Sequence, residues 1–199
     1  MVFHLQTAGM VGEVVLRTND SDVAIILLGS NQNFDPNLVV WMEMGLYTKN
    51  TLRYINITKL YEKLGGTLCK ALPGFHALTG SDSTPVASGR GKLGPYKKLE
   101  KNKKVQKALG NLGETETVNE KAVNEHFHCI VYGYHPKLTS IDVVRLEIFL
   151  KKYKQKKGDT QTFAKKLQSN FFPPCRKVLL EQIKRANLIA ANYKSVTNA

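Results

Sequence analysis

The chain has 199 residues, a hydrophobic content of 42% and a formal net charge of +13. This composition excludes a mostly disordered chain, and the lack of an apolar run of about 18 residues excludes a membrane-spanning helix. The three cysteines, Cys69, Cys129 and Cys175, form no CxxC pair. They therefore indicate neither a disulfide framework nor a zinc finger, and they favour a reduced intracellular compartment.

The positive charge is unevenly distributed along the chain. Residues 1–66 carry a net charge of −1, whereas residues 67–110 and residues 111–199 each carry +7. A basic part beside a chemically distinct acidic-to-neutral part is typical of a protein that docks a polyanion. We therefore expect DNA or RNA as the partner, and with it a nuclear location. A merely solvated basic surface is the alternative.

The hydrophobic pattern predicts a sheet in the first third of the chain. The predicted elements there are a helix over Met1–Gly9, strands over Glu13–Thr18, Leu38–Met44 and Thr51–Ile55, and helices over Val23–Leu28 and Thr58–Leu64. The second and third strands are expected to form a hairpin, because turn-forming residues separate them.

The rest of the chain is predicted to be helical. The predicted helices cover Leu72–Thr79 with Pro73 in the first turn, Tyr96–Leu109, Val118–Tyr132, Ile141–Tyr153 and Cys175–Tyr193. This order predicts an α/β fold, with a small and mainly parallel sheet flanked by helices, followed by an α-helical C-terminal region. We expect a first unit over residues 1–95 and a basic helical region over residues 96–199 packed on it.

Two aspartates follow the first predicted strand. Asp20 and Asp22 are two residues apart, so their side chains point the same way in an extended segment. Ligand sites of open α/β sheets gather at the carboxyl ends of the strands, and Mg²⁺ takes carboxylate oxygens as ligands. Polar residues before an apolar run are also typical of a helix N-cap, and spacing alone favours the cap.

Further candidates lie in the middle of the chain. Asp82 stands in a Gly-Ser-Asp-Ser-Thr segment, which is also a common turn composition. His76 lies in an apolar predicted helix, where packing or hydrogen bonding is a commoner role for histidine than catalysis. The predicted helix Tyr96–Leu109 carries a cluster of lysines: Lys97, Lys98, Lys101, Lys103, Lys104 and Lys107. Such a cluster indicates either phosphate contact or a solvated charged face.

Three short motifs follow one another in the first half of the chain. They are Thr18-Asn19-Asp20-Ser21-Asp22 after a hydrophobic strand, Leu78-Thr79-Gly80-Ser81-Asp82, and the glycine-basic element Gly89-Arg90-Gly91-Lys92. Their order resembles that of flap endonuclease and XPG-type nucleases of the PIN-like superfamily. The chain as a whole is also similar to multicopy animal proteins linked to mobile elements, through residues 72–82 and the tail that begins at Pro173-Pro174-Cys175.

The resemblance implies specific roles for these motifs. It implies that Asp20, Asp22 and Asp82 bind a catalytic divalent metal, Mg²⁺ or Mn²⁺, for phosphodiester hydrolysis by a structure-specific nuclease. It also implies that the glycine-basic element grips nucleic-acid backbone. With the lysine cluster, the candidate nucleic-acid-binding residues are Gly89, Arg90, Gly91, Lys92, Lys97, Lys98, Lys101 and Lys104.

The family's site contains more carboxylates than these three. An acidic pair is expected on the helix before the first strand, but Met1–Gly9 contains neither Asp nor Glu. We therefore expect an N-terminally truncated half-site whose cleavage is weak or absent alone, or a second chain that supplies the missing acids. A non-catalytic nucleic-acid-binding remnant and a protein-interaction scaffold are the alternatives.

Overall fold

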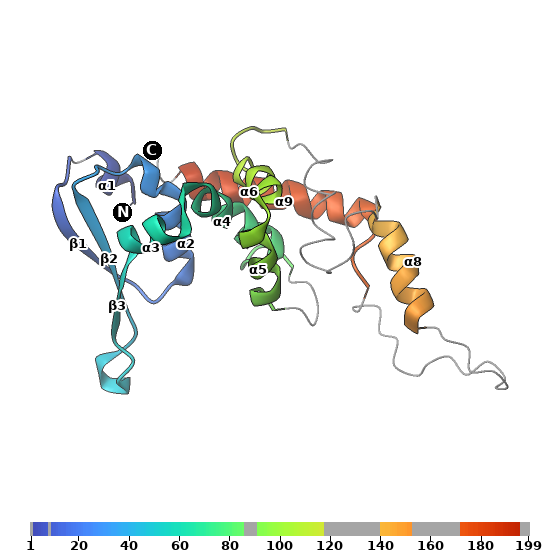
Figure 1. Cartoon of the computed structure of the whole chain (residues 1–199), viewed down its shortest axis with the longest axis horizontal. Coiled ribbons are helices and arrows are strands. Elements are labelled where there is room, and N and C mark those ends of the chain that lie inside the picture. The colour runs from blue at the N-terminus through green and yellow to red at the C-terminus, as the bar shows by residue number, and fades with distance from the viewer. Residues whose placement is uncertain (1, 8, 86–90, 118–139, 153–171, 196–199) are drawn as a thin grey trace.

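A small mixed sheet lies at one end of the molecule (Figure 1). The computed structural model describes residues 2–7, 9–85, 91–117, 140–152 and 172–195 of the chain. The strands, in the order in which they lie side by side, are β1 (Gly12–Arg17), β2 (Leu38–Met44) and β3 (Arg53–Asn56). β1 and β2 run parallel, with Val15 opposite Trp41, whereas β2 and β3 run antiparallel, with Glu43 opposite Tyr54.

The structure confirms the α/β class, the predicted strands and the hairpin. It corrects the predicted strand orientation in the sheet. The sheet was expected to be mainly parallel, but it contains one parallel and one antiparallel pair of strands. The reason is the length of the connections. A short connection can join only antiparallel neighbours, whereas the parallel pair needs a longer crossover, which here carries a helix.

The first hydrophobic core lies between the sheet and the helices nearest to it. These helices are α1 (Val2–Thr7), α2 (Ser21–Ser30) and α3 (Ile57–Leu64). Alternate residues of β2 point into this core, because Leu38, Val40 and Met42 are 2%, 0% and 0% exposed. Leu27 of α2 and Ile57 of α3 are fully buried against them.

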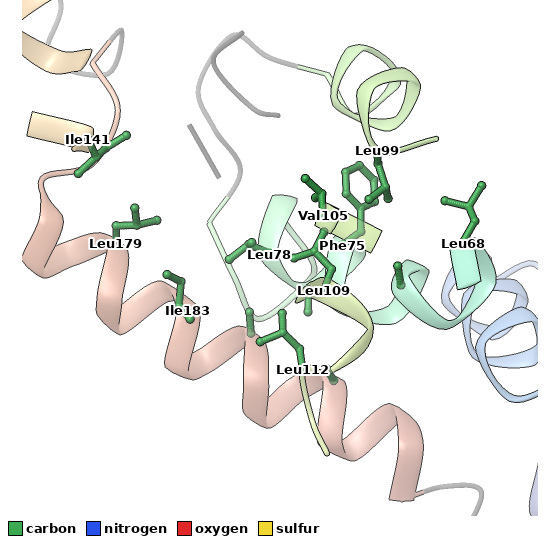
Figure 2. Packing of buried hydrophobic residues seen from close by; sticks show 14 of the residues in the cluster. Leu68, Phe75, Leu78, Leu99, Val105, Leu109, Leu112, Ile141, Leu179 and Ile183 are labelled. Atoms are coloured by element: carbon green, nitrogen blue, oxygen red, sulfur yellow. The ribbon is translucent and has the colours of Figure 1, made fainter. Parts of the chain in front are cut away.

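The second core is purely helical and is shown in Figure 2. It is built by α4 (Gly66–Thr79), α5 (Leu93–Lys101), α6 (Lys103–Gly110), α8 (Ile141–Lys152) and α9 (Arg176–Ser195). The long helix α9 runs along the molecule from α8 towards the sheet (Figure 1). Its buried face carries Leu179, Ile183, Ala186 and Ala190, which are all 0% exposed.

Helix α4 corrects one prediction. It begins at Gly66, so Pro73 lies in its interior and not in its first turn. An interior proline costs a helix about 3 kcal/mol. Burial outweighs this cost, because ten of the 14 residues of α4 are buried and the helix contributes to both cores. Gly29 of α2 allows α2 and α4 to pack closely at Pro73, since a Cβ at Gly29 would lie 2.6 Å from Cγ of Pro73.

The lysine-rich segment corrects another prediction. The single helix expected over Tyr96–Leu109 is two helices, α5 and α6, which meet at Asn102. The Asn102 side chain caps α6 by accepting a hydrogen bond from the backbone N–H of Val105 at 3.3 Å. Buried Gln106 then donates to the carbonyl oxygens of Leu99 and Glu100, each at 3.0 Å, and fixes the corner.

No helix in the described ranges is both long and apolar enough to cross a membrane. The helix predicted over Val118–Tyr132 lies outside the described residues.

Candidate functional site

The aspartates after β1 lie at the N-terminus of α2. Asp20 is the N-cap residue, and its Oδ1 accepts a hydrogen bond from the backbone N–H of Asp22 at 2.8 Å. The backbone N–H of Asp20 is in turn bound by Oγ1 of Thr18 at 3.1 Å. The capping interpretation is therefore confirmed for Asp20. Since α2 already begins at Ser21, Asp22 stands in the first helical turn and not beside Asp20 on an extended segment.

Two side chains from distant helices meet at the carboxylate of Asp22. The hydroxyl of Tyr193, near the end of α9, donates to Oδ2 at 2.8 Å. Nε2 of His76, in α4, lies 3.2 Å from Oδ1. The side chains of His76 and Asp22 are only 12% and 24% exposed. Asp22 thus ties α2 to α4 and to α9, and the packed position predicted for His76 is confirmed.

Burial favours the neutral form of His76. Burial lowers the pKa of His76 and nearby Lys92 acts in the same direction, while Asp22, Asp82 and Asp20 act against them. Nδ1 of His76 is buried without a hydrogen-bond partner among the described residues.

The carboxylates of Asp22 and Asp82 also raise the pKa values of Tyr193 and Lys92. Burial and the hydrogen bond to Asp22 raise the pKa of Tyr193 well above its ordinary value of 10, so the hydroxyl keeps its proton and remains a donor. Burial lowers the pKa of Lys92, whereas Asp22 and Asp82 raise it. Lys92 directly precedes α5 and is half-buried, so the lysine-bearing helices begin beside these acids.

Asp82 reaches this place from the turn that follows α4. The turn is held by Thr84, whose hydroxyl donates to the carbonyl of Ala77 at 2.6 Å and whose Oγ1 accepts from the N–H of Ser81 at 2.9 Å. Asp82 is exposed and acts electrostatically on His76, Tyr193 and Lys92, as Asp22 does. The structure therefore brings the three predicted aspartates into one environment, and we call Asp20, Asp22 and Asp82 the acid cluster.

Protein groups already contact two carboxylates of the acid cluster. Asp20 uses one carboxylate oxygen for its cap, and Asp22 uses both oxygens for Tyr193 and His76. Across the residues that the structure describes, no three histidine, cysteine or acidic side chains form a group that could hold a metal ion. A cation at Asp22 would have to share the carboxylate with the hydroxyl of Tyr193 and with Nε2 of His76.

The predicted nucleic-acid-binding residues are placed in part. Gly89 and Arg90 lie outside the described residues, and Gly91 is exposed in a conformation that does not require glycine. The lysines of α5 and α6 all have exposed side chains: Lys97, Lys98, Lys101, Lys103, Lys104 and Lys107. The break at Asn102 distributes them over two helices and not over one continuous face.

Comparison with known proteins identifies no relative. No protein-family model matches the chain, and neither a curated protein nor a solved structure matches it. The likeness to PIN-like nucleases therefore stays a prediction from the sequence motifs.

Sequence reasoning missed the role of Tyr193. Tyr193 is the last residue of the predicted helix Cys175–Tyr193, and no partner was predicted for it. The signal that could have identified its role is the hydroxyl at the end of an apolar stripe, because a buried phenol requires a hydrogen-bond partner. The partner itself could not be predicted, since Asp22 is 171 residues away in the chain.

The Tyr193–Asp22 hydrogen bond should stabilise the fold measurably. Replacing Tyr193 with Phe leaves the ring in place and removes only the donor. Since a hydrogen bond to a charged group contributes about 1.5–3 kcal/mol and this one is partly exposed, we expect a loss of about 1–2 kcal/mol in the free energy of unfolding in urea. Tyr47→Phe, at a side chain that is 85% exposed, is the matched control and should change nothing. Equal stability of the two variants would contradict the tie.

Neutral His76 should make stability depend on pH. The pKa of His76 is lower in the folded chain than the ordinary 6.5, so the unfolded chain binds more protons below that value. The stability contributed by neutral His76 is therefore present above pH 6.5 and is lost as the pH falls towards the folded pKa. His76→Gln retains a donor but does not titrate. Between about pH 7.5 and about pH 5.5, the wild type should lose more unfolding free energy than His76→Gln.

Proposed function

We propose that the chain is a nucleic-acid-binding protein related to PIN-like nucleases, with a partial divalent-metal site for phosphodiester hydrolysis that is weak or inactive in this chain alone. The observation that carries the proposal is the acid cluster. Asp20 and Asp22, and the distant Asp82, act on the same groups, His76 and Tyr193, at the carboxyl end of a parallel strand. Ligand sites of α/β sheets gather at that end.

The basic helices beside the acid cluster support the nucleic-acid partner. Residues 91–110 contain seven lysines and one glutamate. Six of these lysines are exposed on α5 and α6, and the seventh, Lys92, stands between α5 and the acid cluster. A phosphate backbone bound along α5 would therefore pass next to the carboxylates.

The charge of the acid cluster bears on the strength of binding. Carboxylates beside a bound polyanion repel its phosphates, and this repulsion weakens binding unless a positive charge offsets it. Lys92 supplies one such charge. A divalent cation would supply more, and this is why Mg²⁺ or Mn²⁺ belongs to the proposal although the carboxylates are engaged by protein donors. When bound, such a cation activates water and stabilises the charge on a phosphodiester under attack.

A non-catalytic nucleic-acid-binding protein is the second candidate. It is favoured by Asp22, whose two carboxylate oxygens are already bound by Tyr193 and His76. In that case the acid cluster is a structural tie, and the lysine-bearing helices alone carry the function.

Nucleic-acid binding should depend on the lysines of α5 and α6. In the triple variant Lys97→Gln, Lys101→Gln and Lys104→Gln, we expect weaker binding of labelled DNA and RNA. The salt dependence should be shallower by about two to three counterions, because each phosphate contact that forms releases about 0.7–0.9 of a counterion. Fluorescence anisotropy over a range of salt measures both. The control, Lys59→Gln, Lys63→Gln and Lys177→Gln, removes the same charge from exposed positions on α3 and α9. An equal loss of affinity in both triple variants would mean that net charge, and not the lysines of α5 and α6, determines binding.

Cleavage separates the two candidates. With Mg²⁺ or Mn²⁺ and labelled flap or single-stranded substrates, we expect slow cleavage at most, and we expect Asp82→Asn to abolish it without changing the fold. Asp35→Asn, an exposed acid outside the acid cluster, is the matched control and should leave cleavage unchanged. Cleavage by the Asp82→Asn variant would contradict the proposed metal-dependent mechanism. Intact nucleic-acid binding without any cleavage by the wild type would favour the non-catalytic protein.

A further inference from the structure

The connection between β2 and β3 projects from the sheet, away from the helices, at the lower left of Figure 1. We call residues 45–53 the hairpin tip. It contains a short 3-10 helix, η2 (Tyr47–Lys49), and the side chain of Tyr47 is 85% exposed. Leu46 in the same turn is 42% exposed. Single exposed apolar side chains are common on protein surfaces, so the surroundings of Tyr47 decide which partner it fits.

Hydrogen bonds within the turn hold the hairpin tip in a defined conformation. The backbone N–H of Leu46 donates to Oγ1 of Thr51 at 3.0 Å, and the N–H of Thr51 donates back to the carbonyl of Leu46 at 3.1 Å. Gly45 has a φ of +93°, and a Cβ there would overlap the carbonyl oxygen of Thr51, so the turn requires glycine. Tyr47 is therefore held outwards before any partner arrives, which lowers the entropy cost of binding.

The charges around Tyr47 favour an anionic partner. Lys49 and Arg53 are exposed, and no acidic residue occurs between Gly45 and Asn56. Glu43, at the base of the hairpin, is bound by Nε of Arg17 at 3.0 Å and by the hydroxyl of Tyr54 at 3.0 Å, so its charge is largely offset. An exposed aromatic ring and cations on the same hairpin are the groups on which nucleic-acid bases stack while phosphates are held.

The hairpin tip is joined directly to the loop that leads into the acid cluster. The side-chain oxygen of Asn19 accepts from the N–H of Gly45 at 2.7 Å, and the N–H of Thr18 donates to the carbonyl of Glu43 at 3.0 Å. Asn19 immediately precedes Asp20. Because β1 and β2 are parallel, the residues that follow each strand emerge at the same edge of the sheet. The hairpin tip and the acid cluster therefore share that edge.

We propose that the hairpin tip binds single-stranded nucleic acid, with an unpaired base stacked on Tyr47 and with Lys49 and Arg53 at the phosphates. A single strand is required because the bases of a duplex are already stacked on one another and do not offer a free face. This inference rests on the proposed function and adds the class of substrate and the place where it is gripped. The strand held at the hairpin tip leads past the acid cluster.

Stacking on Tyr47 is tested by comparing three side chains at one position. Tyr47→Ala removes the ring, Tyr47→Phe retains it, and Leu188→Ala is a control at a side chain of α9 that is 64% exposed. Because loss of one stacked base costs about 1–3 kcal/mol, Tyr47→Ala should weaken binding of a labelled oligothymidylate of about 20 nucleotides by roughly 5-fold to 150-fold. Tyr47→Phe and Leu188→Ala should bind it as the wild type does. A duplex of equal length should be bound equally by all four proteins.

The outcomes separate this inference from the proposed function. If the wild type binds no nucleic acid, both fail. If the wild type binds, and the triple lysine variant of α5 and α6 weakens binding while Tyr47→Ala does not, the proposed function stands and the inference is overturned. The exposed ring would then fit a protein partner. Equal weakening for the single strand and the duplex would also overturn it, because stacking would not then be the cause.

Discussion

The carboxylate of Asp22 joins three helices that come from opposite ends of the sequence. It receives the hydroxyl of Tyr193 from α9 and Nε2 of His76 from α4, while its own backbone N–H is capped by Asp20. The position suits an acid, because the N-terminus of a helix carries a partial positive charge. The long helix α9 packs mainly on the second core, and through Tyr193 its far end also contacts the first. Asp22 and helix α4, which belongs to both cores, together fix the relative placement of the sheet and the helical part.

The same tie defines what the acid cluster can do. Three carboxylates in one environment repel one another, and protein donors and Lys92 offset that repulsion in the structure. Any cation that binds there must replace the hydrogen bonds and the positive charge that these groups already supply. Binding of a divalent cation and docking of α9 are consequently linked, since both draw on the oxygens of Asp22. The lysines of α5 and α6 are independent of this competition, because they are exposed and lie outside the tie.

Much of the fold could be predicted from local pattern, whereas the site could be predicted only in part. The strands are runs of β-branched and apolar residues, and β2 was predicted with its observed bounds, Leu38–Met44. Local pattern failed where tertiary packing decided the outcome. Pro73 stands inside α4 because two cores bury that helix, and Asn102 breaks the lysine-rich segment because Gln106 fixes the corner. Motif order brought together Asp20, Asp22 and Asp82, but the contact with Tyr193 spans nearly the whole chain and leaves no local trace.

Helix α4 belongs to both cores, and this has a consequence for how the chain folds. Phe75 and Leu78 face the helical core, whereas Cys69 and Leu72 face the sheet. Neither core can lose α4 without exposing apolar surface of the other, so the two parts are coupled in unfolding although they look separable in outline. The cooperative unit is therefore larger than either core, and a local disturbance in α4 is transmitted to the whole chain.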